Sequence, residues 1–162
     1  MTTASAQAHP CPAYTGQRVL LGTPVNIWDR ELDGISHTDT SIGVLYLGYL
    51  PQCRQVYAEI HLNASGNMIK TGTIYLNDER NNSEGRVSFG PASSNAYIDS
   101  GFVSIDVPEY NAGSTYAAPK AFQAALDYTE YWPCNTIVTS GTHQFSGGKD
   151  FNNGNGATCD HP

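Results

Sequence analysis

The chain is 162 residues long, carries a formal net charge of −7 at pH 7 and has only 14% charged residues, a size typical of one domain with a core of its own. Its 8 Lys and Arg residues argue against binding to nucleic acid or to an anionic membrane surface, because both need clustered positive charge. No run of about 18 apolar residues is present, so membrane insertion is not expected.

The chain begins with a predicted flexible arm, residues 1–10, followed by one predicted β domain over residues 11–162. Short strands are expected at Arg18–Leu21 and Val25–Trp28. The polar stretch Asp29–Thr40 that follows predicts a connection, with a turn signal at its Asp-Gly pair.

The strongest local pattern comes next. Val44–Leu50 is a continuous apolar run, which predicts a strand buried on both faces. Val56–Leu62 alternates between apolar and polar residues, which predicts a strand with one buried and one polar face. The two runs predict a hairpin at the centre of a sheet, with Cys53 at its turn.

Further short strands are expected along the chain, at Thr71–Leu76, Arg86–Phe89, Ala96–Ile98 and Phe102–Val107. Short strands separated by turn signals every 8–12 residues indicate a sandwich or a barrel. The predicted fold is therefore all-β, with seven to ten short antiparallel strands in a sandwich or partly open barrel and at most one helix.

The segment Pro119–Trp132 is the one predicted helix, because Pro suits the first helical position and apolar residues recur at helical spacing. Its β-prone end, Tyr128–Trp132, leaves a strand as the alternative. Thr136–Phe145 is expected to form a last long strand. The Gly- and Asn-rich stretch Ser146–Gly156 is expected to be irregular.

Four cysteines, at Cys11, Cys53, Cys134 and Cys159, are widely spaced and form no CxxC pair. Such an even set predicts two disulfides in an exported protein and disfavours a metal site or a redox motif. Of the three possible connectivities we prefer Cys11–Cys53 with Cys134–Cys159.

The expected location is secreted or extracellular. Residues 1–9 lack the apolar region of a signal peptide, but Ala4-Ser5-Ala6 has the small-x-small form of a cleavage site. We interpret the chain as a mature form whose leader has been replaced by Met1.

The hairpin region resembles a family of small exported bacterial proteins of uncharacterised function, which carries an Arg-Tyr-Ser-Pro-x-Cys turn, an Arg and a Trp-Ala-Arg strand. The matching residues here, within about 20 residues of the chain, are Tyr49, Pro51, Cys53, Arg54, Ala58 and Ile60. Gly48, Leu50, Tyr57 and Glu59 replace the family's Arg, Ser, Trp and second Arg. The resemblance implies export, disulfides and a β fold, and it implies no activity.

Tyr57, Glu59 and His61 are expected to share one face of a strand, about 6–7 Å apart along it. A carboxylate beside an imidazole is able to perform acid–base chemistry within a cleft. We favour the alternative that these residues form the solvated polar face of an antiparallel sheet.

Two stretches with oxygen ligands are candidate metal sites. His37-Thr38-Asp39 lies near Asp29, but no metal-ligand spacing frames the carboxylates, so a solvated acidic loop is preferred. Asp150–Gly156 has oxygen ligands on alternate residues but lacks the glycine position and final Glu of a calcium loop, so a flexible loop is preferred. No cofactor is expected, and whether a metal is bound stays open.

Aromatic residues are the remaining candidates for binding. Trp28 and Trp132, with ten tyrosines and abundant Asn and Gln, are suited to stacking on sugars or to contacts with a protein. The predicted binding residues are Trp28, Tyr57, Glu59, His61, Tyr110, Tyr116, Tyr128, Tyr131 and Trp132.

No catalytic constellation is recognisable, since no GxSxG elbow surrounds a serine and the cysteines are expected to be paired. The predicted function is therefore an exported, non-enzymatic binding or adaptor domain that acts through protein–protein contacts. The first alternative is a carbohydrate-binding module for a surface glycan. A small extracellular hydrolase using Glu59 and His61, or the 29–39 stretch, ranks third.

Overall fold

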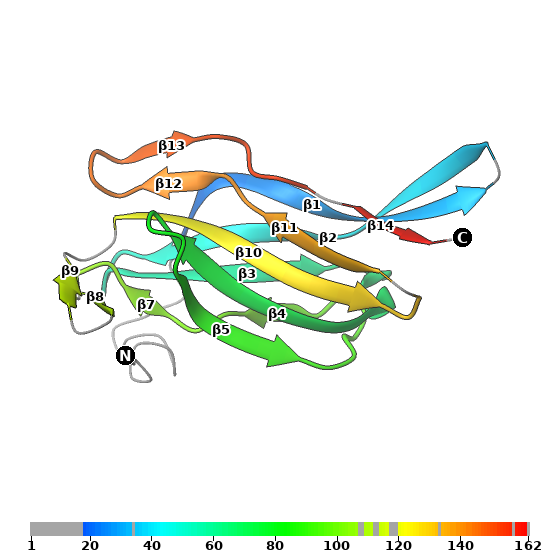
Figure 1. The fold of residues 1–162 in the computed structure, drawn as a ribbon, viewed down its shortest axis with the longest axis horizontal. Coiled ribbons are helices and arrows are strands. Elements are labelled where there is room, and N and C mark those ends of the chain that lie inside the picture. Colours follow the sequence, from blue (N-terminus) through cyan, green and yellow to red (C-terminus); the bar gives the residue numbers. More distant parts are fainter. Residues whose placement is uncertain are drawn as a thin grey trace.

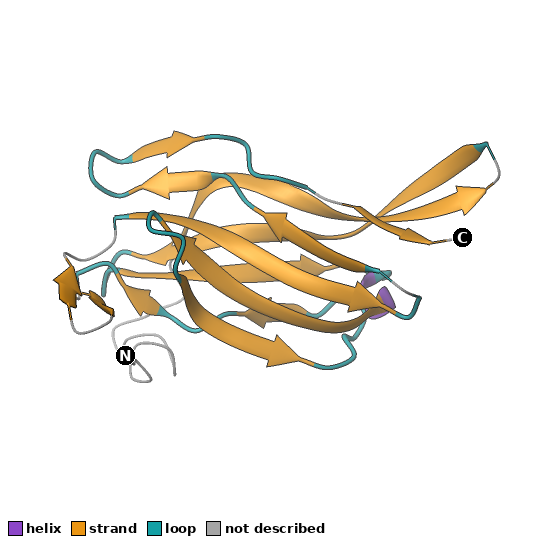
Figure 2. Ribbon diagram, viewed as in Figure 1, coloured by secondary structure: helices purple, strands orange, loops and turns teal. Residues whose placement is uncertain are grey.

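The computed structural model describes residues 18–33, 35–106, 109–111, 114–116, 120–132, 134–156 and 158–161. Two sheets pack face to face, as Figures 1 and 2 show, and they do not close into a barrel. The only helical element in the described residues is the 3-10 turn η1, Gly66–Met68, and no helix there is long and apolar enough to cross a membrane.

The first sheet has the strand order β14-β1-β2-β3-β6, and β7 also pairs with β3. Its pairs are antiparallel except for β1 with β14, which is parallel. The strands are β1 Val19–Asp33, β2 Ser36–Leu50, β3 Gln55–Leu62, β6 Tyr97–Asp99, β7 Val103–Ser104 and β14 Thr158–His161.

The second sheet has the order β13-β12-β10-β4-β5, and β11 also pairs with β10. The strands are β4 Ile69–Asp78, β5 Ser83–Phe89, β10 Ala121–Glu130, β11 Asn135–Thr139, β12 Thr142–Gln144 and β13 Lys149–Phe151. A separate two-stranded hairpin is made by β8 Glu109–Asn111 and β9 Ser114–Tyr116. The all-β sandwich is confirmed, with more strands than the expected seven to ten.

The core lies between the two sheets and follows the period-two alternation of their strands. From β3 it takes Val56, Ala58 and Ile60, so the predicted alternation of this strand is confirmed. From the facing strand β10 it takes Phe122, Ala124, Leu126 and Tyr128, all with no exposed surface.

The predicted helix at 119–132 is wrong: residues 121–130 form strand β10 (Figure 2). Ala124 and Tyr128, which a helix would turn away from Phe122, face the core with it. The strand is paired on one side with β4 over nine residue pairs, and tertiary pairing of this kind overrides weak helical propensity. Pro119, the expected helix start, lies outside the described residues.

The polar connection expected at 29–40 is also wrong, although its turn is correctly placed. The stretch completes β1 and begins β2, so that the two strands form one hairpin with Asp33 opposite Ser36. Figure 1 shows the end of this hairpin extending beyond the sandwich. Most residues of this hairpin end are polar because no second sheet lies beside it to cover an apolar face.

Two expectations near the C-terminus need correction. The long strand at 136–145 is interrupted at Ser140 and Gly141, because the Ser140 hydroxyl accepts a hydrogen bond from the Ala124 amide (2.9 Å) and the Gly141 amide donates to Thr23 across the two sheets (2.8 Å). The stretch 146–156, expected to be irregular, contains β13.

The described residues contain one disulfide, Cys134–Cys159, in agreement with one of the two preferred bonds. It joins the start of β11 to β14 across 25 residues. The expectation of two disulfides is not supported beyond this bond, and the proposed Cys11–Cys53 pair involves Cys11, which lies outside the described residues.

Candidate functional site

The outer face of β3 carries the first candidate site. Tyr57, Glu59 and His61 point away from the core, on one face as predicted. Strand β6 brings two more side chains to this face, because Glu59 pairs with Asp99 and His61 pairs with Tyr97. We call these five residues together with Arg18 the Glu59 cluster.

The inner part of the cluster is not solvated, which corrects the preferred interpretation of a polar sheet face in water. Tyr57 is 2% exposed and Glu59 is 4% exposed. The Tyr57 ring lies across Gly48 on β2, where a Cβ atom would come within 2.5 Å of it. Glycine at this position therefore allows the ring to lie close to the sheet.

Glu59 is the centre of the polar contacts. Its Oε1 atom accepts a hydrogen bond from the Arg18 guanidinium and lies 2.5 Å from Nε2 of His61. Arg18 also donates to the Tyr57 hydroxyl at 3.1 Å. One carboxylate thus orients an arginine and an imidazole at the surface of the sheet.

The two carboxyl groups of the cluster hold one proton between them at neutral pH. Burial by itself raises the pKa of Glu59, but hydrogen bonds from Asp99 and His61 and the charge of Arg18 outweigh it and hold that pKa below its usual range. Loss of hydration and the adjacent Glu59 carboxylate raise the pKa of Asp99 to about 8. Asp99 is therefore the protonated partner.

The proton on Asp99 leads to a prediction for how the stability of the fold depends on pH. Between about pH 4 and pH 8 the folded chain keeps a proton on Asp99 that the unfolded chain has lost, so the free energy of unfolding falls as pH rises. In Asp99→Asn the amide replaces the protonated acid and donates to Glu59 at every pH. We expect the melting temperature of Asp99→Asn, relative to the wild type, to increase from about pH 5 to about pH 8.

Thermal melts of both proteins across that range provide the measurement. Burial and the neighbouring Asp29 raise the pKa of Glu130 to about 9, which adds a slope of the same sign to both curves and cancels in the difference. Parallel curves for the two proteins would show that Asp99 does not hold the proton.

The outer part of the cluster is an aromatic surface. The Tyr97 ring stacks on His61 with centroids 4.0 Å apart and an interplanar angle of 6°, while Tyr46 packs on the same imidazole at 4.7 Å. Tyr97 is 68% exposed, and Asp99 is the next residue on the same face of β6. An exposed ring next to a carboxyl group is a surface on which a sugar can stack.

A second group of buried polar residues lies beside the disulfide. Asp29 on β1 and Glu130 at the end of β10 are each 2% exposed and lie against one another. Glu130 also lines an open cavity of about 420 Å³ with Lys70, Thr71, Thr129, Tyr131, Trp132 and Cys134. The stretch 29–39 is therefore not the solvated acidic loop that was expected, because it belongs to β1 and β2 and its Asp29 is buried.

The predicted aromatic residues do not form one surface in the described part of the chain. Tyr128 is buried and donates to the Trp28 carbonyl (3.1 Å), whereas the exposed Tyr131 and half-buried Trp132 line the cavity beside Glu130. Tyr110 and Tyr116 belong to β8 and β9, and their side chains lie outside the described part of the structure.

In the two stretches considered as metal sites, the carboxylates bind other residues of the chain. Asp39 forms an ion pair with Arg30 (2.9 Å) and lies 3.8 Å from His37. Asp150 contacts Nδ1 of His143 at 2.5 Å and accepts from the Gly22 amide at 3.0 Å. These carboxylates fasten strands to one another.

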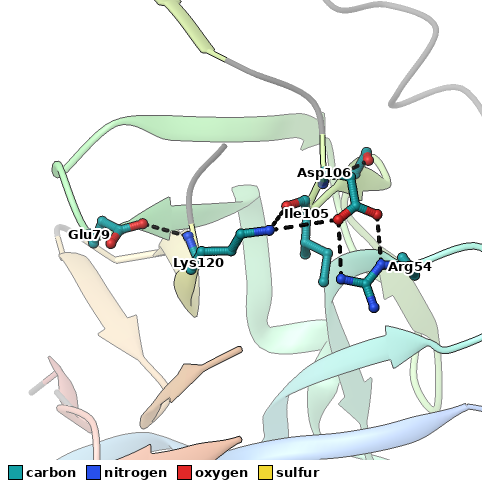
Figure 3. Close-up of polar contacts among 6 residues, drawn as sticks. Arg54, Glu79, Ile105, Asp106 and Lys120 are labelled. Atoms are coloured by element: carbon teal, nitrogen blue, oxygen red, sulfur yellow. Dashed lines mark hydrogen bonds and ion pairs between the residues drawn. The ribbon is translucent and has the colours of Figure 1, made fainter. Parts of the chain in front are cut away.

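The turn between β2 and β3 has a structural role as well. Arg54 binds Asp106 through two hydrogen bonds of 2.7 and 3.1 Å. Figure 3 shows that Lys120 joins this group, donating to the Ile105 carbonyl at 2.8 Å, while its amide donates to Glu79 at 2.5 Å. Arg54 thus fixes the turn between β2 and β3 against the chain after β7, and Lys120 fixes the same chain against the start of β10.

The hairpin end is the third candidate site. From Ser36 to Thr40, β2 pairs only with β1 among the described residues, since pairing with β3 begins at Gly43. Ile35 at the tip is fully exposed and Leu32 is 47% exposed. The hairpin end, residues 30–40, therefore presents an open strand edge beside apolar side chains.

Sequence reasoning found part of the Glu59 cluster and missed Arg18, Tyr97 and Asp99. The period-two pattern of Tyr97 and Asp99 around Ile98 indicates that the two side chains share a face, but local sequence does not predict that β6 pairs with β3.

Comparisons of the chain with models of protein families, with curated proteins and with solved structures found no match.

Proposed function

We propose that this protein is an exported binding or adaptor protein that engages a protein partner through its hairpin end. The observation that carries the proposal is the open edge of β2 on a hairpin that extends beyond the sandwich (Figure 1). An exposed strand edge is a template for pairing with an extended segment of another protein. Secretion and kinship with the resembling bacterial family are parts of the same proposal.

The charge of the hairpin end supports a partner of a particular chemistry. Residues 30–40 include three carboxylates and one guanidinium, and that guanidinium, Arg30, is already paired with Asp39. Asp160 on β14 adds a further negative charge beside Arg30. The partner segment is therefore an extended strand with basic side chains and with apolar residues that cover Leu32 and Ile35.

A shortened hairpin tests the proposal. Arg30 and Asp39 are directly opposite one another, so replacing residues 31–38 with Asn-Gly closes the hairpin with a two-residue turn and leaves the sandwich unchanged. We expect the tagged wild-type chain to recover a stoichiometric partner from the secreted proteins of its source and the shortened chain to lose it. Ile35→Lys, which removes the apolar contact and adds a charge that repels a basic segment, should weaken the same complex at least tenfold.

The matched control is Ile137→Lys, which places the same change on β11 at a side chain that is 50% exposed. It should bind the partner as the wild type does. Recovery of no partner, or equal recovery by the shortened chain, would contradict the proposal.

A carbohydrate-binding function is the second candidate, and the exposed Tyr97 beside Asp99 favours it. In this case a sugar ring would stack on Tyr97 while its hydroxyls bind Asp99. Tyr97→Ala should lower the affinity for a glycan found on an array at least tenfold, because stacking provides the apolar contact. The shortened hairpin should keep that affinity, and an array without a reproducible glycan would remove this candidate.

A further inference from the structure

The two cysteines of the disulfide lie among buried carboxyl groups. Asp29 on β1 is directly opposite Cys159 on β14, and both are almost completely buried. Glu130 approaches from β10 in the other sheet, and Cys134 follows four residues later. Three strands from two sheets thus converge on one point.

The ligand atoms at this point are close enough to hold one ion. A carboxylate oxygen of Glu130 and the sulfur atoms of Cys134 and Cys159 all lie within 4.8 Å of one another. In a tetrahedral zinc site, bonds of about 2.0–2.3 Å separate neighbouring ligand atoms by about 3.3–3.8 Å, so only small movements are required.

The surroundings of the Glu130 carboxyl group are a second observation that supports a cation at this place. It is 2% exposed, and neither of its oxygens accepts a hydrogen bond in the described structure. Its close neighbour is another carboxyl group, that of Asp29. Two carboxyl groups buried against one another are costly to ionise together, and a cation beside them would remove that cost.

We propose that the chain with this disulfide reduced binds one Zn²⁺ through the thiolates of Cys134 and Cys159 and the carboxylates of Glu130 and Asp29. Reduction by a dithiol converts the protein disulfide to two thiols while the dithiol itself becomes a disulfide. Zn²⁺ then displaces the two thiol protons and the proton held by Glu130, and all three pass to the solvent. The metal joins β14 to β10 and β11, as the disulfide does in the oxidised chain. The inference does not depend on the proposed function.

The experiment uses the full chain with Cys11→Ser and Cys53→Ser, so that only two thiols remain. The protein is reduced with a phosphine without oxygen, and Zn²⁺ is titrated in competition with a chromophoric chelator. We expect one Zn²⁺ per chain in the reduced form and none in the oxidised form. Co²⁺ in place of Zn²⁺ should give the intense d–d bands of a four-coordinate site with thiolate ligands.

Two variants separate this site from metal binding by loose thiols. Glu130→Gln should weaken the affinity at least tenfold, whereas Asp99→Asn, which replaces a carboxyl group of the Glu59 cluster, outside the site, by the same kind of amide, should leave it unchanged. If the reduced chain unfolds without metal, Zn²⁺ should restore its circular dichroism spectrum and Glu130→Gln should impair this recovery. Absence of binding, an unchanged affinity in Glu130→Gln, or six-coordinate Co²⁺ would overturn the proposal.

Discussion

Replacing Phe122 with alanine is expected to lower the free energy of unfolding by about 3–5 kcal/mol, because it removes a fully buried aromatic side chain from a core that cannot fill the space. The ring packs edge-on against Phe145 with centroids 6.1 Å apart. It lies on β10, a strand paired with β4 and with β11 or β12 on its other side. The substitution therefore removes packing at the centre of the second sheet.

Denaturation in urea monitored by tryptophan fluorescence measures this change. Ile137→Ala on β11 is the control, and because its side chain is half exposed we expect a change within about 0.5 kcal/mol. A loss below about 1 kcal/mol for Phe122→Ala would contradict the position of β10 in the core.

Removing the disulfide should have an effect of similar size. Replacing Cys134 and Cys159 together with alanine is expected to cost about 3–4 kcal/mol in a metal-free buffer, because the bond closes a loop of 25 residues in the unfolded chain. The bond also holds β14 beside β1, where only four residue pairs join the two strands. Detachment of β14 would expose Asp29 and Glu130 to water.

Equilibrium unfolding of the double variant, with a chelator present, measures the loss. The reduced wild-type chain under the same conditions is the control, and it should lose a similar amount. A double variant as stable as the oxidised wild type would show that the bond contributes nothing to the fold.

The sequence predicted the β class and the central hairpin because these depend on local patterns. The apolar run of β2 and the alternation of β3 each place apolar side chains on the face that packs against the second sheet. The other face of β2, which was expected to be buried as well, is only half-buried at Val44 and Tyr46. The helix at 119–132 was predicted wrongly, with a strand as the alternative, because the apolar residues of this segment fit both the helical and the strand period. Pairing with β4, which is more than 40 residues away in the chain, decided between them.

The candidate sites were less predictable for a different reason. Tyr57, Glu59 and His61 share one strand, so their common face follows from period two. Arg18 and Asp99 reach Glu59 from positions about 40 residues away on either side, through the order of strands in the sheet. No local pattern encodes that order.

The hairpin end was missed because its composition is that of a loop. Strands need an apolar face only where another layer covers them, and nothing in the described structure covers residues 36–40. The direct pairing of Arg30 with Asp39, with hydrogen bonds of 2.9 and 3.4 Å, supports the strands there. A polar hairpin of this kind is available for binding because the core does not use it.

The most direct test of binding through the hairpin end is hydrogen–deuterium exchange of the backbone amides with and without the captured partner. If the partner adds a strand to β2, the amides of residues 36–40 should exchange more slowly in the complex, while those in the Glu59 cluster should be unchanged. Protection confined to the Glu59 cluster, or unchanged exchange at residues 36–40, would contradict the proposal that this protein binds through its hairpin end.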